Sequence, residues 1–137
     1  MQPPDRKIVV TGNVGGNAMM TVTRLKSNGS LDTTFDGDGT ATIDVGSASD
    51  IANDAVLQPD GKIVVAGSMQ ALAGDFAVGR LNADGSPDTT FGTAGKATVD
   101  FGAAAFGNAV ALQRNRRIVV AGQRTGNDDF AVARLLG

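Results

Sequence analysis

The sequence has 137 residues, a length typical of a single domain, and a formal net charge of −2. So small a net charge gives no electrostatic reason to expect binding to nucleic acid or to an anionic membrane. Cys and His are both absent, which excludes disulfides, thiolate zinc sites and Ser-His-Asp catalysis.

A six-residue stretch occurs three times, as KIVVTG, KIVVAG and RIVVAG, beginning at Lys7, Lys62 and Arg117, 55 residues apart. Each copy is a β-branched run that follows a polar turn and closes on Gly, which predicts a buried strand. With 19 Gly residues and few strong helix formers other than Ala, long helices are not expected. The chain is therefore predicted to be one domain, residues 1–137, with repeats at approximately 5–59, 60–114 and 115–137.

Each full repeat is predicted to hold four short strands separated by Gly, Asn and Asp turns. In the middle copy they are residues 52–58, 62–67, 75–81 and 96–101. Counterparts lie at 7–12, 19–25 and 40–45 before it, and at 107–113, 117–122 and 129–135 after it. Four antiparallel strands that recur at this period are typical of a β-propeller blade. The alternative is a β-sandwich of ten strands, which needs no repeated motif.

Arg24, Arg80 and Arg134 recur at the same position of their repeats. A repeated Arg can line an anion site. The favoured interpretation is an ion pair within each blade, with Asp32 or Asp44 in the first copy and their counterparts, Asp88 or Asp100, in the second. Six Phe residues at strand or repeat-equivalent positions are predicted to be core: Phe35, Phe76, Phe91, Phe101, Phe106 and Phe130.

The string over residues 53–91 resembles the delta-60 repeat, a family of bacterial repeats associated with β-propellers. Residues 58–67 match the typical QPDGKIVVAG in full, and residues 75–92 match DFAVARLNADGSLDTSFG closely, with Pro87 where Leu is usual. Arg6 and Arg116 replace the turn Gly of the other copies. The resemblance implies a propeller fold and an extracellular or cell-surface setting, although residues 1–7 lack the apolar core of a signal peptide. It implies no catalytic residues.

The predicted strands number three, four and three along the chain, about two and a half repeats. Closed propellers have roughly four to eight blades, and a fan of three incomplete blades would leave apolar edges open. We therefore expect closure by self-assembly, most simply as a two-fold homodimer with five or six blades. The alternative is that the sequence is a piece of a longer propeller. No apolar stretch approaches the roughly 20 residues of a membrane helix, so membrane insertion is not expected.

Polar residues gather where the innermost strands of a propeller and its loops meet the channel mouth. The candidate ligand-binding residues are Asn53, Asn108, Asp50 and Asp54, with Asn127, Asp128 and Asp129 from a loop. Closure would multiply these oxygen ligands around the axis, where they could hold a small polar ligand or a divalent ion. The structural alternative is that the Asn side chains form hydrogen bonds with neighbouring backbone and the Asp side chains face water.

Asp36 and Asp38, within Asp-Gly-Asp-Gly, resemble part of a calcium loop, and calcium is the one cofactor that the sequence suggests. The chain has no Glu for bidentate coordination, and the second copy of this turn has no acid, which favours a plain turn. The first functional hypothesis is a binding or scaffolding module with its site at the channel mouth. The second is a metal-dependent hydrolase of esters, lactones or phosphoesters, in which an axial ion activates water without His. This second hypothesis rests on analogy of fold.

Overall fold

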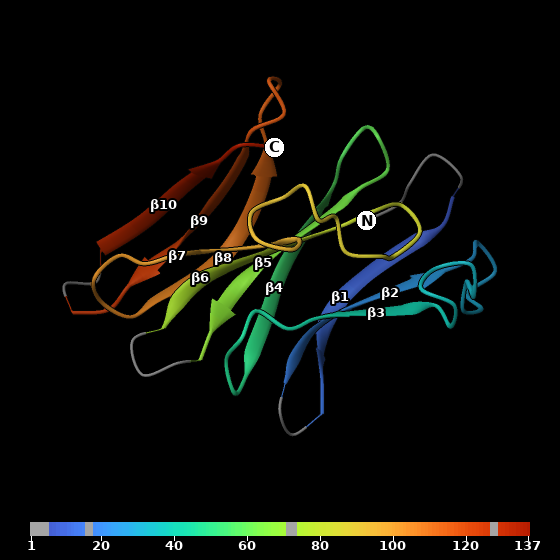
Figure 1. Ribbon diagram of the computed structural model, residues 1–137, viewed down its shortest axis with the longest axis horizontal. Helices are drawn as coiled ribbons and strands as arrows, with labels where there is room; N and C mark the ends of the chain where they lie inside the picture. The colour runs from blue at the N-terminus through green and yellow to red at the C-terminus, as the bar shows by residue number, and fades with distance from the viewer. Residues whose placement is uncertain (1–5, 16–17, 71–73, 127–128) are drawn as a thin grey trace.

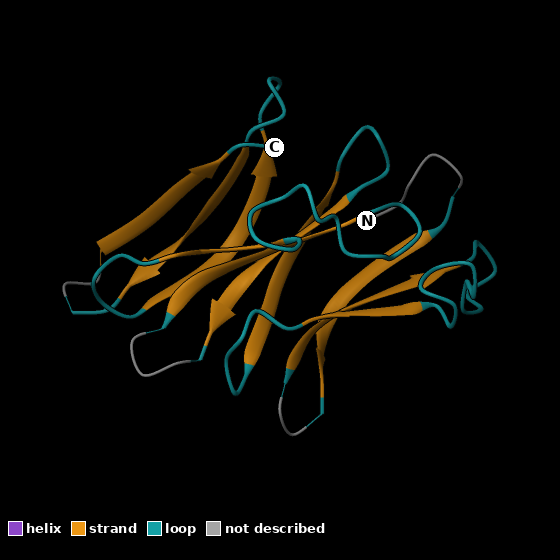
Figure 2. Cartoon of the chain, in the orientation of Figure 1, coloured by secondary structure: helices purple, strands orange, loops and turns teal. Residues whose placement is uncertain are grey.

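The computed structural model describes residues 6–15, 18–70, 74–126 and 129–137, which form strands and turns (Figure 2). The first sheet contains β1 (Ile8–Val14), β2 (Met19–Leu25) and β3 (Thr40–Ile43). The second contains β4 (Asp50–Leu57), β5 (Ile63–Met69), β6 (Asp75–Leu81) and β7 (Lys96–Val99). The third contains β8 (Ala105–Leu112), β9 (Ile118–Arg124) and β10 (Asp129–Leu135). Over these ranges no helix has the length and apolar character needed to cross a membrane.

Each sheet is an antiparallel meander of consecutive strands, and the three sheets lie side by side in an open fan (Figure 1). This confirms the strand count of three, four and three and argues against a two-sheet sandwich. The outermost strands are shorter than predicted, because β3 ends at Ile43 and β7 at Val99. Asp44 and Asp100 end them, since each carboxylate accepts a hydrogen bond from the amide of the Gly two residues later and turns the chain.

The second sheet is buried on both faces, because its side chains alternate between two cores. Ile63 and Val65 pack with the first sheet, whereas Val64 and Ala66 pack with the third. The close approach of the first sheet needs a small residue on β6, since a Cβ on Gly79 would lie 2.7 Å from the Cδ1 atom of Ile43. β5 therefore contributes alternate side chains to both cores.

The Gly that closes the repeated motif is required by a β-bulge in the neighbouring strand. The bulges lie between Ala52 and Asp54 in β4, and between Gly107 and Ala109 in β8. A Cβ on Gly67 would lie 1.7 Å from the carbonyl oxygen of Ile51, so only Gly allows the bulged strand to approach.

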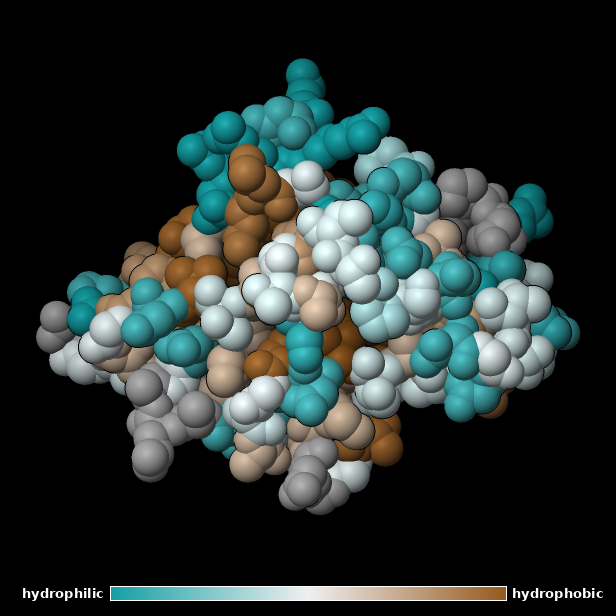
Figure 3. Space-filling view, viewed as in Figure 1, coloured by the Kyte–Doolittle hydropathy of each residue, from teal (hydrophilic) through white to brown (hydrophobic). Residues whose placement is uncertain are grey.

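The prediction that every Phe is core is wrong for Phe130, which is 95% exposed. Its counterpart Phe76 is fully buried between the second and third sheets. Phe130 occupies the same position in β10, but no further sheet among the described residues covers it. Hydrophobic residues are accordingly visible at the surface over the third sheet (Figure 3).

Candidate functional site

A buried carboxylate cluster is built twice, once at the edge of the first sheet and once at the edge of the second. In the first, Arg24 Nε donates to Asp32 Oδ2 at 2.7 Å, and Lys7 Nζ lies 3.0 Å from the same oxygen. The Thr34 hydroxyl donates to Asp32 Oδ1 at 2.7 Å. The Arg24 guanidinium stacks 4.7 Å from the centre of the Phe35 ring. The predicted pairing of Arg24 with Asp32 is confirmed.

The second sheet repeats the same contacts. Arg80 Nε donates to Asp88 Oδ2 at 2.7 Å, Lys62 Nζ lies 2.9 Å from that oxygen, and the Thr90 hydroxyl donates to Oδ1 at 2.7 Å. Arg80 stacks 4.8 Å from the centre of the Phe91 ring. Of the two predicted partners of Arg80, Asp88 is therefore the one that binds it.

These contacts keep both carboxylates ionised. The Thr34 hydrogen bond, with those from Lys7 and Arg24, holds the pKa of Asp32 well below its usual range despite burial. Burial alone would raise the pKa of Asp88, but hydrogen bonds from Lys62 and Thr90 outweigh it, and that pKa also lies well below its usual range. The result is a pair of carboxylates that stay ionised at neutral pH, each fixed by two cations.

The third sheet carries the cations without the carboxylate. Arg117 stands where Lys7 and Lys62 stand, and Arg134 where Arg24 and Arg80 stand. Arg134 is exposed, and neither side chain has a hydrogen-bond or ion-pair partner among the described residues. Arg117 and Arg134 therefore form the cationic half of a cluster that also contains a carboxylate in the first and second sheets.

The Lys of each cluster was not predicted from the sequence. The signal was present, because the first residue of the repeated motif is basic in all three copies: Lys7, Lys62 and Arg117. A recurring cation directly before a buried strand indicates a recurring anion, but the distance along the chain between Lys62 and Asp88 hides the partnership.

The candidate residues on the inner strands meet neighbouring backbone. Asn53, at the bulge of β4, donates from Nδ2 to the Gly107 carbonyl at 2.8 Å. Asp54 accepts from the Val110 amide at Oδ2, 2.8 Å, and from its neighbour Ala55 at Oδ1, 2.9 Å. Both side chains therefore link β4 to β8. Asn53 binds neighbouring backbone, as the structural alternative expected, whereas Asp54 binds a backbone amide of β8 instead of facing only water.

The other candidates are dispersed. Asp50 is fully buried and accepts from the Val45 amide at 2.8 Å and from the Ser47 hydroxyl. Asn108, at the bulge of β8, and Asp129, at the start of β10, are exposed. Asn127 and Asp128 lie outside the described residues. The described part of the chain thus brings Asn53 and Asp54 together with the β8 backbone, but does not gather the predicted ring.

The proposed calcium loop forms a turn. Asp36 has a positive φ of 50°, and its amide donates to the Asp84 carbonyl at 2.7 Å. Asp38 Oδ1 accepts from the Thr40 amide at 2.8 Å. Within residues 6–15, 18–70, 74–126 and 129–137, no three Asp carboxylates converge as a metal site would need.

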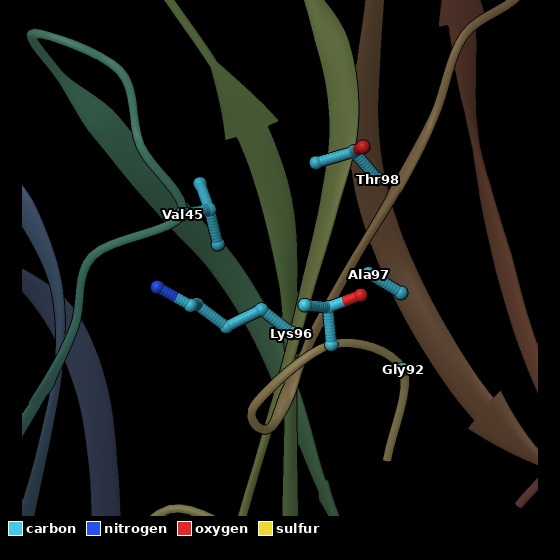
Figure 4. A pocket seen from close by; sticks show the side chains of 6 residues that line it. Val45, Gly92, Lys96, Ala97 and Thr98 are labelled. Atoms are coloured by element: carbon cyan, nitrogen blue, oxygen red, sulfur yellow. The ribbon is translucent and has the colours of Figure 1, made fainter. Parts of the chain in front are cut away.

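A pocket of about 450 Å³ lies between the loop after β3 and the outer strand β7. Lys96 crosses it, and its Nζ donates to the Asp44 carbonyl at 2.6 Å (Figure 4). The remaining lining residues are small or apolar: Val45, Gly92, Thr93, Ala97 and Thr98. With its one charged group engaged in joining two sheets, the pocket offers no convergent polar groups for catalysis.

Comparison with known proteins agrees with the repeat structure. No curated protein matches the chain. A family described as a beta-propeller domain of unknown function, DUF5122, matches residues 4–35, 58–91 and 113–137. The first two matched segments end at Phe35 and Phe91, the rings that stack on Arg24 and Arg80, so each spans one complete carboxylate cluster. Since the three segments cover more than half of the chain and fall on its three repeats, the chain belongs to the DUF5122 beta-propeller family.

Proposed function

We propose that copies of this chain assemble head to tail into a closed propeller that serves as a binding or scaffolding module. The observation that carries the proposal is the chemistry of the two outer faces of the fan. Each repeats a face that is buried inside the molecule, yet each is uncovered. They are named here the leading face, on the first sheet, and the trailing face, on the third sheet.

The leading face is formed by Ile8 and Val10, which are 36% and 49% exposed. Their counterparts in the second sheet, Ile63 and Val65, are 1% and 0% exposed, because the first sheet covers them. Apolar residues that are exposed on one copy of a repeat and buried on the next favour a missing neighbour over a solvated surface.

The trailing face is formed by Phe130, Val132 and Arg134 on β10. Phe76 and Val78, the counterparts of its two apolar residues, are fully buried against the third sheet. A leading face on a trailing face would therefore reproduce the packing of the two internal interfaces. Such a contact is heterologous and closes into a ring when its rotation divides the circle. Two copies, each with three sheets, would give a homodimer with six blades.

A ligand site is proposed at the axis of the closed ring. Asn53 and Asn108 occupy the equivalent bulges of β4 and β8, and both are exposed. Asn53 donates to β8, whereas the described residues give Asn108 no such acceptor. Closure would repeat these amides around the axis, where they could bind a small polar ligand.

Native mass in solution tests the assembly. We expect a closed oligomer for the parent chain and a monomer for Val10→Asp and for Val132→Asp, since each places a charge on one face. The matched control is Leu31→Asp, which charges an exposed apolar side chain on a turn outside both faces and should leave the oligomer intact. A monodisperse monomer for the parent chain would refute the proposal.

The same measurement with a chelator, and a calcium titration, separates the scaffold from the hydrolase alternative. An oligomer that is indifferent to chelator and takes up no calcium supports the scaffold. Calcium uptake that is lost in the Asn53→Ala, Asn108→Ala double variant would support an axial ion instead, and would call for assays of ester and phosphoester hydrolysis.

A further inference from the structure

The first and second sheets each contain a complete carboxylate cluster, and the third sheet contains only its cations. In each, an Arg on the third strand of the repeat and a basic residue before the second strand hold one Asp carboxylate, eight residues after the Arg. Arg134 and Arg117 repeat that pair, but among the described residues no carboxylate lies against either side chain. In the part of the chain that the structure describes, β10 pairs with β9 alone, so its other edge is open.

We propose that the free edge of β10, with Arg117, Arg134 and the trailing face, binds a separate polypeptide segment that carries the pattern Asp-x-Thr-Phe followed by a short strand. The proposal goes beyond head-to-tail assembly, because packing of a second copy on the trailing face would leave the β10 edge open and would not supply the Asp carboxylate that binds Arg24 and Arg80 in the other sheets. The ligand is defined by chemistry that the chain displays twice.

The carboxylate supplies the polar part of the recognition. Asp88 binds Arg80 through its side chain, and its backbone amide donates to the Arg80 carbonyl at 2.9 Å, so one residue fixes both the charge and the direction of the segment. An Asp presented to Arg134 can make the same two contacts. Charge-assisted bonds to two cations are strong when they are shielded from water, as the Phe91 ring shields Arg80.

The aromatic residue supplies the apolar part. Phe91 is buried in the same core cluster as Phe76 and Val78. Their counterparts Phe130 and Val132 are 95% and 61% exposed, which leaves room for a ring on the trailing face. A bound Phe would cover part of both side chains and stack on Arg134.

The strand supplies the register. In the second sheet, Lys96 pairs with Gly79 and Val99 with Phe76. Transferred to the third sheet, the Lys of a bound segment would lie opposite Ala133 and its Val opposite Phe130. Strand addition at an open sheet edge is a general mode of peptide recognition, in which main-chain hydrogen bonds add affinity and side chains add specificity.

The test uses a fluorescent peptide with the sequence of residues 82–101 and the full chain carrying Val10→Asp, which removes head-to-tail assembly from the measurement. We expect saturable binding by fluorescence polarisation. Arg134→Ala in the chain, and Asp88→Asn in the peptide, should each weaken binding about tenfold or more. The two changes together should cost little more than either one, because they remove the same contact.

Hydrogen exchange gives a second readout. Peptide binding should protect backbone amides of β10 and leave β1, an edge strand of the first sheet, unchanged. The proposal is overturned if no binding occurs up to about 1 mM peptide, or if binding is insensitive to both Arg134→Ala and Asp88→Asn. It is also overturned if protection appears in the first or second sheet instead of β10. These outcomes do not depend on whether the parent chain oligomerises.

Discussion

The second and third sheets have nearly the same sequence and very different surroundings. KIVVAG and DFAVGRL form β5 and β6, in which every residue from Ile63 to Ser68 and from Phe76 to Leu81 is buried. RIVVAG and DFAVARL form β9 and β10, in which only alternate residues are buried: Ile118 and Val120 in β9, and Ala131 and Ala133 in β10. The difference comes from the neighbours: the second sheet has one on each face, whereas the third has one on a single face.

One repeat sequence therefore encodes two interfaces, one with the preceding sheet and one with the following sheet. Phe76 and Phe130 have the same local sequence, but only Phe76 has a neighbouring sheet to pack against. Burial in this fold is therefore a property of the stack of sheets, as expected for repeat architectures in which each unit contacts its neighbours. Substitutions at equivalent positions should have unequal effects, and the inequality measures what each neighbour contributes.

The largest inequality is expected at the closing Gly of the motif. A methyl group on Gly67 meets the Ile51 carbonyl oxygen, whereas one on Gly12 meets nothing within 4 Å, because β1 is an edge strand in the described part of the chain. Gly67→Ala should lower the free energy of unfolding by about 3 kcal/mol or more, and Gly12→Ala should change it by less than about 0.5 kcal/mol. Urea unfolding of both variants checks this. Equal losses would mean that a strand also occupies the open edge of β1.

The next effect distinguishes the filled and unfilled carboxylate clusters. Asp88→Asn would leave Arg80 and Lys62 without their anion beneath the Phe91 ring, which should cost about 3 kcal/mol of unfolding free energy. Arg134→Ala removes the counterpart of Arg80 where no anion is bound, and should cost less than about 0.5 kcal/mol. Urea unfolding at neutral pH compares the two. A large loss for Arg134→Ala would show that Arg134 already has a partner in solution.

The pH dependence sharpens the same contrast. Because the pKa of Asp88 is lowered in the folded chain, its contribution is present above the pKa of the unfolded carboxyl, about 3.9, and is lost as the pH falls from there toward the folded pKa. The stability difference between the parent chain and Asp88→Asn should stay constant from about pH 7 to pH 4 and shrink below about pH 4. Burial and the nearby charge of Asp100 raise the pKa of Asp75, which acts with the opposite sign in both proteins and cancels in the difference. A gap that widens in acid would contradict the assigned role of Asp88.

The strands and their grouping were predictable from the sequence because local chemistry decides them. Gly, Asn and Asp mark each turn. Arg24 binds Asp32 and Arg80 binds Asp88 within the same repeat, so these pairs could be predicted from short spacings in the sequence. Long-range neighbours were not predictable in the same way. Asn53 binds the Gly107 carbonyl of the next inner strand, a contact that depends on a bulge in β4 that no residue in the sequence marks.

The exposure of Phe130 is a second feature that could not be predicted from the sequence. Its local pattern is that of a core residue, and only the position of its sheet at the end of the fan exposes it. The environment of Asp50 is a third such feature. Its carboxylate is fully buried and accepts a hydrogen bond from the Val45 amide, whereas the sequence pattern is that of a polar loop residue. Burial and pairing of polar groups between sheets need the three-dimensional stack, so the candidate site was less predictable than the fold.

The smallest effect is expected at the turn before the repeated motif, where three equivalent residues have positive φ: Arg6 at 60°, Gly61 at 86° and Arg116 at 65°. Gly adopts this conformation without strain, whereas a side chain crowds the following carbonyl. Arg116→Gly should therefore raise the unfolding free energy by about 0.5 kcal/mol, since relief of strain is partly offset by the greater entropy of an unfolded Gly. Gly61→Ala should lower it by about 1 kcal/mol, because the added Cβ also lies 3.2 Å from the Cβ of Ala83. Thermal unfolding of the two single variants and of their combination checks both signs. If Arg116→Gly destabilises the chain, the Arg116 side chain makes a contact that outweighs the strain, and the turns of the second and third repeats differ in more than their glycine.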